Sequence, residues 1–289
     1  MSSETRVVTS RSGLRQAYAD LRPGTARAVV LTMGALHEGH ARLVREARAL
    51  LGPDGHVTVT VFVNPTQFAA GEDLERYPRS LESDVEVCAR EGADLVFAPS
   101  VETVYRDPKP QVTVDPGPLG TLLEGAVRPG HFRGVLTVVA KLVLLTGAQV
   151  VVLGEKDYQQ LVLVRRMVRD LDLPVEVVGV PTVRDDDGVA LSSRNAYLDA
   201  EHRRAAAVVP QALERGRTVA RQGGSPRDVV SAVQVHLDSV PDLVTDYAVV
   251  TDPELGAPPE QGEARLLVAV RLGGVRLIDN VRIALGGTA

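Results

Sequence analysis

Cysteine is almost absent from this sequence, and long apolar runs are absent altogether. Cys88 is the single cysteine among 289 residues, which excludes an internal disulfide and a cysteine-rich zinc site and favours a reducing compartment. No stretch approaches the roughly 18 apolar residues of a membrane span, and the N-terminal segment lacks the apolar core of a signal peptide. We therefore expect a cytoplasmic protein that neither enters a membrane nor is exported.

An excess of positive charge is also missing. The 32 lysines and arginines are outnumbered by 37 aspartates and glutamates, which gives a net charge of −5. General attraction to nucleic acid is therefore not expected, and anionic ligands must be bound by local sites. The 44% hydrophobic and 24% charged residues are typical of a folded globular chain. At about 150 residues per domain, its length suggests two domains.

The first part of the chain alternates short β-branched runs with segments of helical periodicity. This alternation predicts βαβ units and a Rossmann-like, doubly wound parallel sheet, so the expected fold class is α/β. The segment from Pro99 to Gly120 is rich in proline and glycine, so we expect an irregular excursion there. The predicted strands are Ala28–Thr32, Val57–Val63, Leu95–Ala98, Val150–Leu153 and Val175–Val180. Helices are predicted where Leu43, Val44, Ala47, Leu50 and Leu51 recur at helical spacing, and at Leu81–Glu91, Gly134–Leu145 and Gln159–Leu171.

The pattern changes beyond about Pro181. A proline, three consecutive aspartates and a glycine interrupt both periodicities between Val180 and Gly188, which indicates a domain joint. We expect a Rossmann-like ligand-binding domain at residues 1–182 and a second, smaller α+β domain at residues 183–289. The predicted elements of the smaller domain are helices Ala200–Gln222 and Pro226–Asp238 and strands Thr245–Val250, Leu266–Val270 and Val275–Ile283.

Two histidines flank a turn between a predicted strand and a predicted helix, in Thr32-Met-Gly-Ala-Leu-His37-Glu-Gly-His40. Such a turn lies at the carboxyl edge of a parallel sheet, where ligands bind, and the N–H groups of the following helix favour a phosphate. Imidazoles there can donate to phosphate oxygens and stabilise charge that develops during nucleotidyl transfer. Spacing alone leaves two alternatives open: ordinary turn histidines, or a two-histidine metal site, although no further cysteine or histidine lies at ligand spacing.

Neutral amides follow the predicted strand Val57–Val63 and so reach the same edge of the sheet. Asn64 and Gln67 can bind a hydroxyl or a carboxylate without bringing a full charge into a dry pocket. The alternative is that Asn64 merely satisfies backbone groups where a loop starts.

A lysine and an aspartate follow the predicted strand Val150–Leu153, again at the carboxyl edge. Lys156 can neutralise phosphate, and Asp157 can accept from ribose hydroxyls or orient the lysine. Gln160 lies one helical turn further on and points the same way. The alternative for Asp157, which does not exclude the first, is a helix cap that complements the helix dipole.

Two hydroxyls and a guanidinium lie just beyond the domain joint, in Leu191-Ser192-Ser193-Arg194-Asn195. On a mobile loop they suit a lid that closes on a triphosphate and excludes water. The alternative is a capping or turn serine pair with a solvated arginine. Arg128 and His131 add one cationic and one titratable candidate.

Together and in this order, the motifs resemble those of the pantothenate synthetase (pantoate–β-alanine ligase) family over nearly the whole chain. That family belongs to the class I nucleotidyltransferase-like group. Its His-x-Gly-His turn is similar to His37–His40, and its KMSKS-type lid is similar to Leu191–Asn195. Three further motifs resemble those that distinguish the ligase, namely Asn64–Phe68, Arg128–Phe132 and Gly154–Gln160.

The resemblance implies an ATP-dependent ligase that joins pantoate to β-alanine and releases AMP and pyrophosphate through pantoyl adenylate. It also implies a homodimer of two-domain subunits and Mg²⁺ on the phosphates. The residues it assigns to the ATP phosphates, our catalytic candidates, are His37, His40, Lys156, Ser192, Ser193 and Arg194. It assigns the ribose to Gly154 and Asp157, adenine to the main chain near Val183, pantoate to Asn64, Gln67, Arg128 and Gln160, and contact with both substrates to Met33.

Two positions depart from the usual family pattern. Leu31 stands in place of a proline and Thr66 in place of a methionine, and we expect Thr66 to wet the apolar wall of the pantoate cavity while activity survives. Glu82-Ser83-Asp84 matches an acidic cluster that helps to hold magnesium in some relatives, but no metal ligand is assigned from it. Two other functions stay open: a related nucleotidyltransferase whose product remains adenylylated, and a nucleotide-binding scaffold without turnover.

Overall fold

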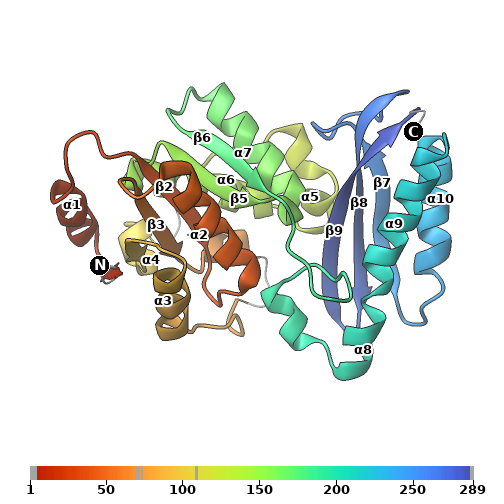
Figure 1. Cartoon of the computed structure of the whole chain (residues 1–289), viewed down its shortest axis with the longest axis horizontal. Coiled ribbons are helices and arrows are strands. Elements are labelled where there is room, and N and C mark those ends of the chain that lie inside the picture. The colour runs from red at the N-terminus through yellow and green to blue at the C-terminus, as the bar shows by residue number, and fades with distance from the viewer. Residues whose placement is uncertain (1–4, 69–71, 73, 108–109, 287–289) are drawn as a thin grey trace. The chain divides into compact units, whose positions relative to one another are not determined.

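The computed structural model describes residues 5–68, 72, 74–107 and 110–286. The chain falls into two compact units, whose elements are labelled in Figure 1. The first unit comprises Met1–Glu155 and Leu163–Pro181, and the second comprises Lys156–Val162 and Thr182–Ala289. The sequence pattern places Lys156–Val162 in the first domain, whereas these residues group with the second unit. The domain boundary after residue 182 stays a prediction.

A six-stranded parallel sheet forms the centre of the first unit, in the order β1-β4-β3-β2-β5-β6. This sheet confirms the predicted doubly wound α/β class. The edge strand β1 has three residues, of which only Val8 is buried, and it is not among the predicted strands. The strands are β1 (Arg6–Val8), β2 (Arg27–Thr32), β3 (His56–Val61), β4 (Leu95–Phe97), β5 (Val150–Gly154) and β6 (Glu176–Val180).

Helix α2 shows why the sequence folds in this way. Leu43, Val44 and Ala47 recur at helical spacing and are buried against Val30 and Val59 of the sheet. Each fully buried valine or leucine contributes roughly 2 kcal/mol to folding. The helices of this part of the chain are α1 (Arg11–Ala19), α2 (Glu38–Leu51), α3 (Leu81–Arg90), α4 (Val101–Val104), α5 (Glu124–Val127), α6 (His131–Thr146) and α7 (Tyr158–Asp170).

Short 3₁₀ turns connect several of these elements. Between Pro99 and Gly120, the described residues form only α4 and the start of a 3₁₀ turn, in keeping with the predicted irregular excursion. Among the described residues no helix is both long and apolar enough to cross a membrane. The 3₁₀ turns are η1 (Pro65–Gln67), η2 (Pro118–Thr121), η3 (Glu155–Asp157) and η4 (Ser193–Tyr197).

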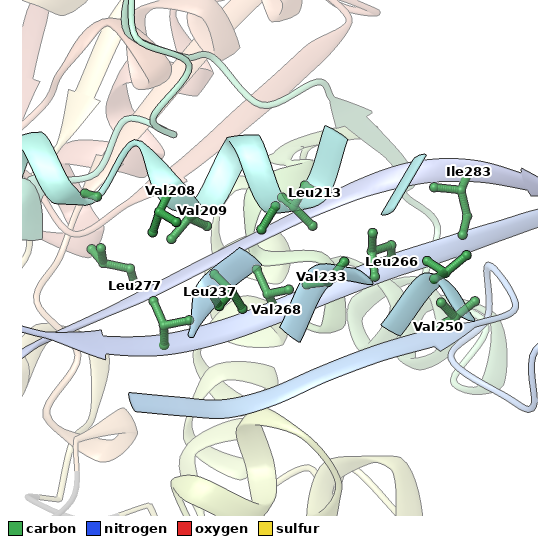
Figure 2. Close-up of a cluster of buried hydrophobic side chains, with 14 of the residues drawn as sticks. Val208, Val209, Leu213, Val233, Leu237, Val250, Leu266, Val268, Leu277 and Ile283 are labelled. Carbon is green, nitrogen blue, oxygen red and sulfur yellow. The ribbon is translucent and has the colours of Figure 1, made fainter. Parts of the chain in front are cut away.

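The second unit has a three-stranded antiparallel sheet, β7-β8-β9, with α9 and α10 packed against it. Its core, drawn in Figure 2, joins Leu213 of α9 and Val233 of α10 to Leu266 of β8. The hairpin between β8 and β9 turns on Gly273 and Gly274, whose φ angles are 57° and 75°. The elements are α8 (Ala200–Ala205), α9 (Val208–Arg221), α10 (Pro226–Leu237), β7 (Val244–Thr251), β8 (Gly262–Leu272) and β9 (Val275–Leu285).

One predicted helix of this unit is wrong. The sequence pattern predicts a single helix at Ala200–Gln222, whereas α8 ends at Ala205 and α9 begins at Val208. Pro210 explains the break, because proline lacks an N–H group and clashes with the preceding turn of a helix interior. In the structure it lies in the first turn of α9, where no such hydrogen bond is needed.

Candidate active site

The connection from β2 to α2 leaves the sheet at its topological switch point. Strand β2 pairs with β3 on one side and with β5 on the other, so the chain diverges from β2 in both directions. In doubly wound sheets, ligands bind at the carboxyl ends of the strands at this place. The predicted histidine turn begins at this point, directly after Thr32.

His37 and His40 both cap the N-terminus of α2. Nδ1 of His37 accepts a hydrogen bond from the Gly39 N–H at 3.1 Å, and Nδ1 of His40 accepts from the His37 N–H at 3.3 Å. The two ring centroids are 4.1 Å apart. A neutral imidazole with an accepting Nδ1 carries its proton on Nε2, so each ring is in the tautomer that can donate from Nε2. Capping therefore fixes the tautomer of both predicted phosphate ligands.

The turn before these histidines is held by a buried carboxylate. Asp84, on α3, accepts hydrogen bonds from the N–H groups of Ala35 at 3.1 Å and Leu36 at 2.8 Å. Ala35 has a φ of 53°, which is rare for a residue other than glycine, and Gly34 has a φ of 87°. A Cβ at Gly34 would lie 2.9 Å from Asp84 Oδ2. Asp84 thus supports the turn that leads to both candidate histidines, a contact that sequence reasoning missed.

Asn64 organises the loop that follows β3. It is 1% exposed, and its Nδ2 donates to Gln67 Oε1 at 3.1 Å and to the Gly134 carbonyl at 3.2 Å. Its Oδ1 accepts from the hydroxyls of Tyr105 and Thr66, each at 2.9 Å. The Thr66 hydroxyl is therefore used within the loop. With both of its amide hydrogens donated, Asn64 is placed to orient Gln67.

Met33 and Gln67 meet, although they are 34 positions apart. Nε2 of Gln67 lies 2.7 Å from Sδ of Met33. Met33 belongs to the histidine turn after β2, and Gln67 belongs to the loop after β3. The loops that follow these two neighbouring strands are therefore in contact. An amide beside a thioether suits a ligand with both polar and apolar parts.

Arg128, His131 and Glu72 form a connected polar cluster behind Gln67. Nε and Nη2 of Arg128 donate to the two oxygens of Glu72 at 2.7 and 2.6 Å, a bidentate pair. Nη1 of Arg128 donates to His131 Nε2 at 3.1 Å, and His131 Nδ1 donates to the Gln67 carbonyl at 2.8 Å. Burial and the adjacent guanidinium lower the pKa of His131 to about 4, so its ring is neutral at pH 7.

Gly154 ends β5, beside β2 in the sheet. Its φ is not in the left-handed region, and a Cβ built there would meet no described atom within 4 Å. Neither backbone conformation nor packing within the described chain requires glycine here. Open space at the carboxyl edge is compatible with the close approach of a ligand.

The remaining predicted residues belong to the second unit. The main-chain carbonyl of Lys156 accepts from Asn280 at 3.0 Å, and the carbonyl of Val183 accepts from the N–H of Leu191 at 3.0 Å. Ser192 caps η4, since its Oγ accepts from the Arg194 N–H at 3.3 Å. The other predicted residues of this unit are Asp157, Gln160 and Ser193.

The predicted residues thus form two sets. The first unit brings Met33, Asn64 and Gln67 into direct contact, with Arg128 reaching Gln67 through its carbonyl at 3.3 Å. Among the described residues, no group of three or more histidine, cysteine, aspartate or glutamate side chains could hold a metal ion. Asp84, part of the acidic cluster to which the sequence assigns no metal, holds main-chain N–H groups instead.

The chain has the doubly wound α/β fold, a class of protein in which ligands bind at the carboxyl edge of the sheet. The chain belongs to the pantoate-β-alanine ligase family, because the family model of that description matches residues 6–282. Members of this family are ligases, so the predicted enzyme class and family are confirmed.

Similar proteins support the assignment. Pantothenate synthetase of Nocardioides sp. is 54% identical, over 99% of this chain and 87% of that protein. A crystal structure of pantothenate synthetase from Thermus thermophilus is 50% identical with a TM-score of 0.89, over 96% of this chain and 99% of that one. A pantoate-β-alanine ligase from Francisella tularensis, crystallised with β-γ ATP and β-alanine, is 30% identical with a TM-score of 0.79, over 96% and 97%.

We predict that Asp84→Asn destabilises the histidine turn. An amide NH₂ in place of one oxygen faces a main-chain N–H and leaves a donor unsatisfied, which costs about 1–3 kcal/mol of the free energy of unfolding. Displacement of the turn should also lower kcat/KM for ATP by at least about 10-fold. Urea denaturation and steady-state kinetics measure both effects. Glu82→Gln, an exposed change in the same helical turn, is the control, and equal behaviour of the two variants would contradict this role.

We also predict a pH-dependent stability term from His131. Its pKa of about 4 is below the unfolded value of about 6.5, so between these values the unfolded chain binds a proton that the folded chain does not. The free energy of unfolding should therefore fall by up to about 3 kcal/mol as pH drops from 6.5 to 4. His131→Gln removes this term. Urea denaturation across that range should show the advantage of wild type over His131→Gln shrinking with falling pH; a constant difference would refute the assignment.

Proposed function

We propose that this chain forms pantothenate from pantoate and β-alanine in two steps at one nucleotide site, and releases AMP and pyrophosphate. The observation that carries the proposal is the match to the pantoate-β-alanine ligase family across residues 6–282. The Francisella tularensis relative, crystallised with β-γ ATP and β-alanine, supports these substrates. Domains at residues 1–182 and 183–289, the first for nucleotide and pantoate and the second as a lid, are part of the proposal.

In the first step, the pantoate carboxylate attacks the α-phosphate of ATP, and pyrophosphate leaves. No side-chain nucleophile is needed, because the substrate carboxylate is the nucleophile and the protein supplies alignment and charge stabilisation. His37 and His40 donate from Nε2 to phosphate oxygens, which agrees with the tautomer that their capping bonds fix. Further donors to the phosphates are Lys156, Ser192, Ser193 and Arg194.

The adenosine part of ATP is bound by Gly154, Asp157 and the main chain near Val183. The open space at Gly154 supports this role, since a Cβ built there meets no described atom within 4 Å. Asp157 accepts from ribose hydroxyls, and the main chain at Val183 pairs with the adenine edge.

Pantoate is bound by residues that follow strands β2, β3 and β5 along the chain. Met33 covers its apolar part, while Gln67 and Gln160 hydrogen-bond its hydroxyl and carboxylate oxygens. The contact between Gln67 and Met33 supports this division. Asn64 and Arg128 line the cavity and act by orienting Gln67, because Asn64 donates to its side chain and Arg128 to its carbonyl.

In the second step, the β-alanine amine attacks the pantoyl carbonyl and displaces AMP. The mixed anhydride would hydrolyse in contact with water, so a loop at Ser192–Arg194 that closes over it protects the intermediate as well as binding phosphate.

Mg²⁺ bound together with ATP would add positive charge to the triphosphate. This proposal assigns no residue of the chain to hold the ion. The carboxylate oxygens of Asp84 accept from Ala35 and Leu36, which does not fit a role as a magnesium ligand.

We further propose that the protein acts in the cytoplasm as a homodimer. A reducing compartment suits the single cysteine, whose thiol is inert because burial raises the pKa of Cys88 to about 12. The dimer rests on the family resemblance, and its test is the molecular mass in solution.

We predict AMP and pyrophosphate as products when ATP, pantoate and β-alanine are supplied. His40→Ala and Lys156→Ala should each slow pantoyl-adenylate formation by at least about 100-fold, the scale of a lost transition-state donor, with the fold intact. Mass spectrometry and a pyrophosphate-release assay measure products and rate, and His236→Ala, in a helix of the second unit, is the control. ADP as product would refute the proposal, and a stable adenylylated acceptor would favour the nucleotidyltransferase.

A second prediction isolates the ribose contact. Gly154→Ala should leave the thermal midpoint unchanged or slightly raised, because the new methyl group meets no described atom and the φ angle is ordinary. The methyl group should obstruct the sugar and raise KM for ATP by about 10-fold, equivalent to about 1.4 kcal/mol. An unchanged KM for ATP would exclude Gly154 from the nucleotide site.

A further inference from the structure

Strand β9 carries two consecutive polar residues that are almost fully buried. Asp279 and Asn280 are each 3% exposed, and their neighbours across the strand pair are Val268 and Leu267. Polar groups buried in a sheet destabilise the fold unless they are hydrogen-bonded. Asn280 and Asp279 each have one partner at or next to a residue that the family resemblance assigns to ATP, namely Lys156 and Arg184, which follows Val183.

Asn280 holds the main chain at Lys156. Its Nδ2 donates to the Lys156 carbonyl at 3.0 Å, and its Oδ1 accepts from Nε of Arg265 at 2.7 Å. The guanidinium of Arg265 lies 3.9 Å from the centre of the Tyr158 ring, and the Tyr158 hydroxyl donates to the Pro253 carbonyl at 2.9 Å. The segment from Lys156 to Tyr158 is thus tied to the small sheet at two points.

Asp279 holds a second segment. It accepts from both terminal nitrogens of Arg184, at 2.6 and 2.9 Å, and Nη1 of Arg184 also donates to the Gly188 carbonyl at 2.9 Å. Arg184 pairs with Ala190 in a short antiparallel bridge that carries the chain from Val183 towards Ser192. One dipeptide of β9 therefore fixes two loops of the second unit.

We propose that Asn280 is a positioning residue for adenylate formation, which acts by fixing the backbone from which the Lys156 ammonium reaches the phosphates. The inference rests on the proposed role of Lys156. A lysine side chain has four flexible carbons, so its catalytic geometry depends on where its backbone is held. A displacement of about 1 Å in a catalytic group is enough to cost up to about 100-fold in rate.

The substitution Asn280→Asp distinguishes between the two hydrogen bonds of this side chain, one with Arg265 and one with the Lys156 carbonyl. The aspartate retains an oxygen that accepts from Arg265, while its second oxygen opposes the Lys156 carbonyl and repels it. Pantoate-dependent pyrophosphate–ATP exchange measures adenylate formation in four proteins: wild type, Asn280→Asp, Lys156→Ala and the double variant. Arg282→Ala is the control, because Arg282 lies two residues along β9 and pairs at the surface with Glu263.

We expect Asn280→Asp to slow exchange by about 10-fold at saturating ATP when Lys156 is present, and by less than about 2-fold when Lys156 is already alanine. The control variant should behave as wild type. Equal losses in both backgrounds, or no loss in the first, would overturn the inference while leaving the role of Lys156 intact. Full exchange activity of Lys156→Ala would refute the proposed role of Lys156 itself, and the inference with it.

Circular dichroism and thermal unfolding show whether each variant is folded. If Asn280→Asp does not fold, Asn280→Ala takes its place in the same cycle, since it removes the bond to Lys156 without adding charge. The same coupling to Lys156 is expected, and additive effects would again overturn the inference. A purely structural role would reduce the amount of folded protein equally in both backgrounds and produce no coupling.

Discussion

The hydrogen bonds from Ala35 and Leu36 to the buried Asp84 carboxylate are the constraint on which the histidine turn depends. They hold a left-handed residue in place, and the chain then enters α2 with two imidazoles as its caps. The capping bonds in turn set which nitrogen of each ring carries its proton. A buried carboxylate thereby supports the turn that leads to both imidazoles.

The sheet was largely predictable because its signals are local. Val57–Thr60, for example, combines β-branched residues with full burial, and alternating helices imply parallel pairing. The failures have physical causes as well. Strand β1 has only one buried residue, Val8, whereas the equally short β4 is buried throughout and was predicted. The break before α9 is caused by a single proline within a long amphipathic pattern. The extent of β8 and β9 is set by their pairing, which a single segment does not reveal.

Candidate residues could also be proposed from the sequence, because motifs at strand ends stand out along the chain. The contacts that hold these residues in place could not be predicted. Asp84 and Leu36 are 48 positions apart, and Asn280 and Lys156 are 124 apart, so only the folded chain shows that they touch. Likewise, the sequence shows Arg128 only as an additional cationic candidate. In the fold, Glu72 neutralises its charge, and His131 links it to Gln67.

The hydrogen bond from Asn280 of β9 to the Lys156 carbonyl has a consequence for biosynthesis on the ribosome. Lys156 emerges long before Asn280, which is translated 124 residues later. Until that late strand has been made, the earlier loop lacks the amide that anchors it. The nascent chain can therefore build its parallel sheet first, while the loop at Lys156 stays without this anchor until β9 has been made.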